Sequence, residues 1–245
     1  AVWVGHDWGA VAVWNIASHH PDRCVAAANL CIPYATFERG LDVLVGLVNR
    51  DVYPESEYPY GNWEYQRFYE EHFTKATSAM EANVAGTFKT LFRAGDPEGK
   101  GKPGLLSQVR RHGGWFGGKG AAPDLPRDAR IMTESDLHAY ASAYERTGFF
   151  GTDSLYMNHS ANAAYAAEAL NDAYLDMPVL FLEAEFDYTC DCVNSSLSKP
   201  MQELCRDLVI ERIQSGHWMA QEKPVEVNAR LAAWLGAKVP HAWGR

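Results

Sequence analysis

The sequence has neither a long apolar run nor a cluster of basic residues. No apolar run reaches the ~18 residues that a membrane-spanning helix requires. Acidic residues outnumber basic residues, 31 to 22, and the formal net charge is -9. A negative chain without a Lys/Arg patch is poorly suited to the phosphate backbone of nucleic acids. We therefore expect no membrane span and no nucleic-acid partner.

Cysteine is scarce, and its pattern predicts neither disulfides nor a metal site. Five cysteines occur in 245 residues, and an odd number in a long chain argues against a disulfide framework. Cys190 and Cys192 are separated by one residue, whereas the usual metal motifs have a two-residue gap and a matching second pair. The Gly-Lys stretch at 99–102 also lacks the spacing of a phosphate-binding loop. The sequence thus predicts reduced, structural thiols, no metal and no cofactor.

The start of the chain lacks an initiator methionine and a signal-like segment. Its first residues, AVWV, read as the end of a buried strand, so the sequence begins inside an element. We expect an N-terminally truncated chain of a cytoplasmic protein, and any targeting signal upstream stays open. The oligomeric state also stays open.

Residues 1–32 predict a strand, a sharp turn, a helix and a second strand. The helical pattern at 10–20 is stopped by Pro21, and 24–32 is a continuous run of small apolar residues, typical of a strand covered on both faces. A strand–helix–strand unit implies a parallel sheet with a right-handed crossover. The same alternation returns later, with strands expected at 178–183 and 208–213 and helices at 195–207 and 224–235.

Residues 34–170 differ from the parts that flank them, because they are rich in Tyr, Trp and Phe and lack a second run of buried strands. Helical stretches are expected at 62–94 and 134–146. The length and the 47% hydrophobic content suit one large α/β domain with an insertion. We predict an α/β fold in which 1–33 and 171–245 form the parallel-sheet core and 34–170 form a helical cap.

The segment GHDWGA at residues 5–10 has the pattern of a nucleophile elbow, a strained strand-to-helix turn that raises one side chain above the sheet. Asp7 holds the position of the nucleophile, and Gly5, Gly9 and Ala10 supply the small neighbours that let the turn close. The following helix directs backbone N–H groups toward the site, which favours negative charge. Taken alone, Asp7 is also an ordinary helix N-cap.

An elbow nucleophile needs an acid and a histidine, in that order, later in the chain. Asp187 follows one predicted strand, and His217 lies in the loop SGHW after the next. Ligand sites of α/β proteins form at the carboxyl ends of strands, where both residues are expected. Glu185 and Asp191 compete with Asp187 for the role of the acid.

A carboxylate nucleophile changes the expected reaction. Because Asp7 is ionised at neutral pH, it attacks an sp³ carbon without a base and forms an alkyl ester. His217 then removes a proton from the water that hydrolyses the ester. Asp187 orients the imidazole and stabilises its protonated form.

The segments GHDWGA, FDYTC and SGHW resemble those of soluble epoxide hydrolases of the α/β-hydrolase superfamily. TFKTLFRAGD at 87–96 and the GGWF stretch at 113–116 resemble the cap of that family, so the likeness covers nearly the whole chain. The resemblance implies an α/β-hydrolase fold with an inserted helical cap, and hydrolysis of epoxides to vicinal diols.

The resemblance also implies two cap tyrosines that hydrogen-bond the epoxide oxygen and act as acids on ring opening. The first lies in WEYQRF and is Tyr65, and the second lies in GFFGTDSLYMNH and is Tyr156. Two phenol groups aimed at that oxygen stabilise its charge as it develops. In a chain with 12 tyrosines, the competitors are Tyr58, Tyr60 and Tyr69.

The surroundings of these residues are expected to complete the pocket. Trp8 is expected to give its backbone N–H to the oxyanion hole and its ring to the pocket, which Gln66 and Trp218 also line. The family carries a His-Gly-x-Pro segment before the elbow, whose loop supplies the second oxyanion-hole N–H, and this chain has none. We therefore expect a core that lacks its early strands, with apolar surface along the exposed strand edge.

Two other functions stay open. Haloalkane dehalogenases resemble the chain in fold, Asp nucleophile and the motif HDWG, but need halide-binding N–H donors, often a Trp pair, instead of cap tyrosines. An inactive fragment or a ligand-binding module is the second alternative, since fold does not fix function. The aromatic cap favours a lipophilic epoxide as the small-molecule substrate, with water as the second reactant.

Overall fold

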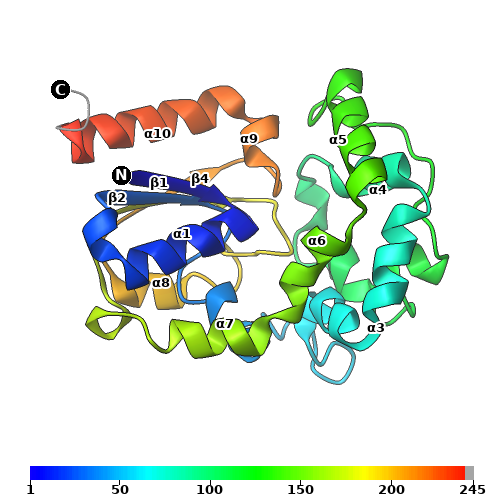
Figure 1. The fold of residues 1–245 in the computed structure, drawn as a ribbon, viewed down its shortest axis with the longest axis horizontal. Helices are drawn as coiled ribbons and strands as arrows, with labels where there is room; N and C mark the ends of the chain where they lie inside the picture. The colour runs from blue at the N-terminus through cyan, green and yellow to red at the C-terminus, as the bar shows by residue number, and fades with distance from the viewer. Residues whose placement is uncertain (241–245) are drawn as a thin grey trace.

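The centre of the fold is a four-stranded parallel sheet in the order β1-β2-β3-β4 (Figure 1). The computed structural model describes residues 1–240. The chain fills two neighbouring strands before the long insertion and two after it, so the insertion leaves the sheet between β2 and β3. The strands are β1 (Val2–His6), β2 (Ala26–Leu30), β3 (Leu175–Ala184) and β4 (Cys205–Ile213).

Strand β2 is buried along its whole length, as expected for a small apolar run inside a parallel sheet. Its side chains alternate between two buried clusters. Ala27 belongs to the cluster that contains Trp14, and Ala28 to the cluster that contains Trp234. The helices that carry these two tryptophans therefore cover opposite faces of the sheet.

Helices on both sides of the sheet complete the core. Figure 1 shows α1 and α8 on one face and α10 on the other. Every strand ends on the side where the long insertion stands, so the carboxyl ends of the strands face the cap helices (Figure 1). The core helices are α1 (Trp8–His19), α8 (Lys199–Leu204), α9 (Met219–Glu222) and α10 (Pro224–Lys238).

The insertion is helical. Helix α5 begins with a capping box, in which Thr133 and Asp136 each satisfy a backbone N–H of the other. Near its end the insertion contacts the core again, since Leu170 N donates to Ser18 O at 2.9 Å. The domain boundaries at 33/34 and 170/171 stay predictions. The helices are α2 (Leu41–Gly46), α3 (Glu64–Glu81), α4 (Val84–Leu91), α5 (Glu134–Thr147), α6 (Phe150–Asp153) and α7 (His159–Ala166).

One predicted element is wrong in its extent. The helix expected over 195–207 spans only Lys199–Leu204, because the chain enters β4 at Cys205. Cys205 pairs with Leu175 and Asp207 pairs with Pro178 in the neighbouring strand. Pairing with β3 thus overrides the local helical pattern.

The stretch expected to be helical over 62–94 is two helices instead of one. Helix α3 ends at Glu81, and Asn83 caps α4 by accepting a hydrogen bond from Gly86 N at 3.0 Å. A side chain that bonds its own backbone in this way favours a new helix start over continuation.

Strand β1 lies at an edge of the sheet. Within residues 1–240 it pairs with β2 alone, and Val4 is 53% exposed. The apolar exposure expected along this edge is therefore present. The same described part of the chain holds no helix with the length and hydropathy that a bilayer crossing needs.

Candidate active site

Asp7 stands on the sharp turn between β1 and α1. The strand ends at His6 and the helix begins at Trp8, which leaves a single residue to reverse the chain. Asp7 has φ 54° and ψ -129°, a backbone conformation that costs a non-glycine residue on the order of 1–3 kcal/mol. Its side chain is 35% exposed. The turn thus presents a carboxylate at the carboxyl end of the strand.

The small residues around Asp7 do not contribute equally to this turn. A Cβ on Gly5 would lie 2.5 Å from Gly9 O and 2.6 Å from Asn29 Oδ1, closer than atoms pack. A Cβ on Gly9 would meet nothing within 4 Å. Ala10 is fully buried. Gly5 is therefore required by packing, whereas the expectation that Gly9 is also required is not supported by its surroundings.

His217 lies between two carboxylates. Its Nε2 is 2.9 Å from Oδ1 of Asp7, and its Nδ1 is 2.6 Å from Oδ2 of Asp187. The other oxygen of Asp187 accepts hydrogen bonds from the backbone N–H groups of Thr189 and Cys190, at 3.1 and 3.0 Å. The three predicted residues, which come from the ends of three strands, therefore form one chain of hydrogen bonds.

Asp191, one of the two competing acids, has other partners. Asp191 accepts hydrogen bonds from the backbone N–H groups of Val193 and Asn194, and it caps its own loop. The bond to His217 is made by Asp187, which is buried. Of the three candidates, Asp187 is thus the one that the structure brings to the histidine.

The charged groups of the site shift the pKa values of one another. Burial alone raises the pKa of Asp7 and of Asp187, but the neighbouring His217 outweighs it and both pKa values are lowered. Burial likewise works against protonation of His217, yet the charge of Asp187 and the hydrogen bonds to both carboxylates raise its pKa well above the usual value. The two carboxylates therefore favour the protonated form of His217 in the free site.

Tyr65 and Tyr156 meet next to this chain of hydrogen bonds. Their ring centroids are 5.4 Å apart in an edge-to-face arrangement, and the ring of Tyr156 packs edge-on against Trp8 at 5.4 Å. Burial raises the pKa of both phenols, and the negative charge of Asp7 raises them further. Both hydroxyls thus stay protonated and lie within electrostatic reach of the elbow carboxylate.

The competing tyrosines have other contacts. Tyr69 donates to Asp153 Oδ1 at 3.1 Å and stacks on Tyr156 with ring centroids 4.8 Å apart. Tyr58 accepts a hydrogen bond from Gln108 at 2.9 Å. Tyr60 lies beneath two guanidinium groups. Tyr69 therefore supports Tyr156, whereas the contacts of Tyr58 and Tyr60 are with other residues.

Trp8, Gln66 and Trp218 surround the site in different ways. Trp8 N donates to Oδ2 of Asp7 at 2.5 Å. Gln66 is fully buried and its Nε2 donates to the hydroxyl of Tyr65 at 3.0 Å, which leaves the phenol proton free. The indole N–H of Trp218 donates to Leu91 O at 2.9 Å, and its ring packs edge-on against His217. Trp218 thus connects the histidine loop to the end of α4.

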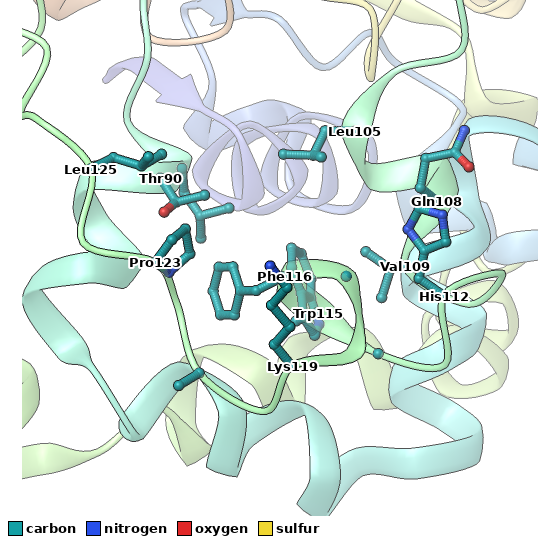
Figure 2. A pocket seen from close by; sticks show the side chains of 14 residues that line it. Thr90, Leu105, Gln108, Val109, His112, Trp115, Phe116, Lys119, Pro123 and Leu125 are labelled. Carbon is teal, nitrogen blue, oxygen red and sulfur yellow. The ribbon is translucent and has the colours of Figure 1, made fainter.

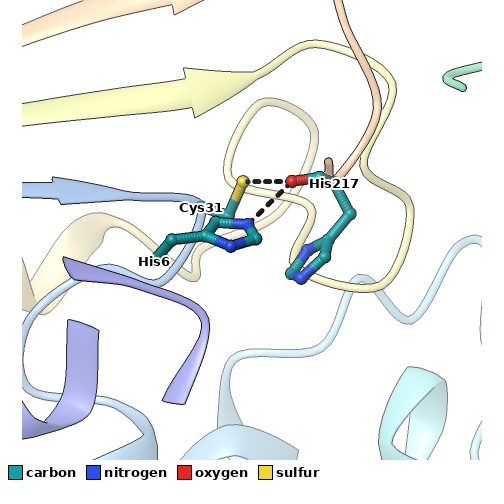
Figure 3. Close-up of side chains that lie close together, drawn as sticks. All are labelled: His6, Cys31 and His217. Atoms are coloured by element: carbon teal, nitrogen blue, oxygen red, sulfur yellow. Dashed lines mark hydrogen bonds between the residues drawn. The ribbon is translucent and has the colours of Figure 1, made fainter. Parts of the chain in front are cut away.

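Two further residues contact the backbone carbonyl of His217, and the sequence did not predict them. Figure 3 shows His6 and Cys31 converging on the backbone carbonyl of His217. His6 Nε2 is 2.8 Å from this oxygen, and Cys31 Sγ donates to it at 3.2 Å. Burial and the nearby His217 lower the pKa of His6, so its neutral ring donates. The position of His6 inside the GHDWGA motif was the only signal in the sequence.

The same side chains include groups with metal-ligand chemistry. His6, Cys31 and His217 bring one ligand atom each within 4.8 Å of one another, and so do Asp187, Cys190 and His217. Both groups depend on His217, whose two ring nitrogens already contact carboxylates. A metal ion would have to replace those bonds, so the geometry fits hydrogen bonding better than a resident metal.

The sheet order, the elbow and the inserted helices define the class of this protein: it has the α/β-hydrolase fold. The structure is similar to that of epoxide hydrolase A from Mycobacterium thermoresistibile, with a TM-score of 0.68, 26% identity and coverage of 96% of this chain and 69% of the other. A potato epoxide hydrolase variant also shares the fold, with a TM-score of 0.65 and 22% identity over 97% and 70% of the two chains. No protein-family model matches the sequence.

The sequence relatives are epoxide hydrolases, so the resemblance seen in the motifs is confirmed. The chain is 30% identical over 236 residues to the bifunctional epoxide hydrolase 2 of Sus scrofa, covering 96% of this chain. It is 28% identical to epoxide hydrolase A of Mycobacterium tuberculosis, covering 96% of this chain and 68% of that one. The chain spans 39% of the length of the pig protein.

Proposed function

We propose that the protein hydrolyses lipophilic epoxides to vicinal diols through an alkyl ester at Asp7. The observation that supports this most is the pairing of two protonated phenols, Tyr65 and Tyr156, with a carboxylate that already contacts His217. An epoxide between them meets a nucleophile on carbon and proton donors on oxygen. The names of the related proteins point to the same reaction.

In the first step, Oδ1 of Asp7 attacks a ring carbon while the bond from that carbon to the epoxide oxygen breaks. The oxygen leaves as an alkoxide and takes a proton from Tyr65 or Tyr156. Because donors placed where charge develops lower the barrier, the two phenols make the ring opening possible in a buried site. The product of this step is an ester at Asp7 and a tyrosinate.

In the second step, His217 takes a proton from water, and the water oxygen attacks the ester carbon. The negative oxygen that forms is Oδ2, which the backbone N–H of Trp8 already holds. The intermediate collapses and releases the second hydroxyl of the diol, which takes the proton from His217. The remaining proton of the water returns from the Asp7 carboxyl to the tyrosinate, so the site is restored.

Formation of the ester prepares His217 for this second step. In the free site the carboxylates of Asp187 and Asp7 raise the pKa of His217 against the effect of burial. An ester at Asp7 carries no charge, so one of these two supports is lost and the pKa of His217 falls. The histidine thus gives its proton to solvent after the nucleophile has reacted and then acts as a base on water. It takes a proton from solvent again when the charge of Asp7 is restored.

The experiment that tests this function is the capture of the ester in a His217→Gln variant. We expect the variant to gain the mass of one aryl epoxide, because the first step does not need His217, and to release no diol. An Asp7→Asn variant is the matched control and should gain no mass. Absence of an adduct in His217→Gln at a folded site would contradict the covalent route.

A haloalkane belongs in the same assay, because an Asp nucleophile also displaces halide. The wild-type protein is expected to convert the aryl epoxide and to leave the haloalkane unchanged, since phenols fit an oxygen leaving group. Conversion of the haloalkane alone would reverse the assignment. Conversion of neither compound would favour the reading of the chain as a binding module or an inactive fragment.

A further inference from the structure

A cavity of about 310 Å³ lies within the cap, and Trp115 in its lining packs against Tyr65. Figure 2 shows it between the end of α4 and the loop that carries Trp115. Its lining is mostly apolar and includes Leu91, Leu105, Val109, Phe116 and Leu125. A cavity of this size and chemistry fits an alkyl or aryl group.

Trp115 separates this cavity from the acid tyrosines. The residue is 5% exposed and lines the cavity. Its ring packs edge-on against Tyr65, with centroids 6.0 Å apart, and lies tilted against Tyr69 at 5.7 Å. Neither tyrosine lines the cavity. The indole is therefore the wall between the two spaces.

Packing alone holds this wall in place. The indole N–H of Trp115 is buried and finds no hydrogen-bond acceptor among residues 1–240. A buried tryptophan usually has one. Because no polar contact fixes the ring, its position depends on its packing, which includes the contacts with the two tyrosines.

We propose that Trp115 is a specificity-determining residue, which limits the length of the epoxide arm on the Tyr65 side and keeps the 310 Å³ cavity closed to the substrate. This inference rests on the proposed epoxide hydrolysis. A smaller apolar side chain at position 115 joins the cavity to the site and turns it into a subsite for a long alkyl arm.

The test compares two epoxides that differ only in arm length, 1,2-epoxybutane and 1,2-epoxydodecane. The measured quantity is the ratio of kcat/KM for the long epoxide to that for the short one. Since each methylene accepted by an apolar pocket changes this ratio about 10-fold or more, we expect Trp115→Leu to raise it at least about tenfold. Trp115→Phe keeps a flat ring without the N–H and is expected to stay within about threefold of wild type.

Refilling the cavity supplies the matched control. Ala121 lines the cavity, and Ala121→Phe in the Trp115→Leu background should return the ratio to the wild-type value. Ala121→Phe alone should leave turnover of the short epoxide unchanged. If Trp115→Leu does not fold, as judged by circular dichroism, Trp115→Met replaces it. Its flexible apolar side chain is expected to raise the kcat/KM ratio in the same direction.

The outcomes separate the two proposals. A Trp115→Leu or Trp115→Met protein that is folded, hydrolyses 1,2-epoxybutane and keeps the wild-type ratio would overturn the role of Trp115. An equal rise in Trp115→Phe would also overturn it, because the wall is then not what discriminates. If the wild-type protein hydrolyses neither epoxide, the result contradicts the proposed function itself and not only the role of Trp115.

Discussion

Replacing Gly5 by alanine tests the elbow, because the structure leaves no room for a methyl group there. The added Cβ would lie 2.5 Å from Gly9 O and 2.7 Å from Ala10 Cα, both atoms of the α1 backbone, and 2.6 Å from Asn29 Oδ1. Backbone atoms cannot move aside as a flexible side chain can, so the first turn of α1 must shift. Asp7 lies in the chain between Gly5 and this first turn, so its carboxylate must move when the turn moves.

The expected magnitude follows from overpacking. Forcing one methyl group into a packed site costs typically about 1–3 kcal/mol, and we expect Gly5→Ala to lower the free energy of unfolding by that amount. Misplacing a reacting group by about 1 Å costs on the order of 100-fold in rate. The variant should therefore lose activity even under conditions where it is fully folded.

Gly9→Ala is the control four residues along the same motif. A Cβ at Gly9 meets nothing within 4 Å, and alanine in a helix is favoured over glycine by roughly 0.5–1 kcal/mol. We expect this variant to be at least as stable as wild type and to keep its turnover. Urea unfolding and epoxide turnover are measured for both. Equal unfolding free energies and equal rates for Gly5→Ala and Gly9→Ala would refute the reasoning.

Three further outcomes are expected. Double substitution of Tyr65 and Tyr156 by Phe should slow ester formation in a single turnover far more than either single substitution, because each single variant keeps one phenol that protonates the alkoxide. A double variant whose rate loss is only the product of two small single losses would contradict this. Asp187→Asn should move the acid limb of ester hydrolysis to lower pH as well as slow it, because the charge that raises the pKa of His217 is gone; an acid limb at higher pH would reverse the sign. Cys31→Ala should slow ester hydrolysis without slowing ester formation, whereas Cys31→Ser, which keeps a donor to His217 O, should stay close to wild type; equal rates for the two would exclude a positioning role.

The sheet was predictable because its strands are short, continuous apolar runs bounded by clear turns. The strand at 24–32 and the helix after GHDWGA were found within two residues at each end. The boundary between α8 and β4 was not, because Cys205 joins the sheet by pairing with Leu175, a contact between distant parts of the chain. Local periodicity carries no information about such a partner.

Tyr65 and Tyr156 lie in the cap and were named from the family resemblance. Asp7, Asp187 and His217 were predictable as neighbours from order and motif, since each follows a strand and parallel strands end at one edge. Their surroundings were not. Cys31 is an isolated cysteine in the sequence, and only the fold brings its thiol to the carbonyl of His217. Trp115 stands in a glycine-rich loop, and its position beside Tyr65 depends on how that loop packs against α3.

The most direct test of the central claim, the ester at Asp7, is a single turnover in H₂¹⁸O with the protein in excess over the epoxide. Water attacks the ester carbon in the proposed reaction, so its oxygen stays on the carboxylate. We expect mass spectrometry to find one ¹⁸O in the peptide that contains Asp7 and none in the diol. Label in the diol and none in that peptide would show that water opens the epoxide directly, and would contradict the account.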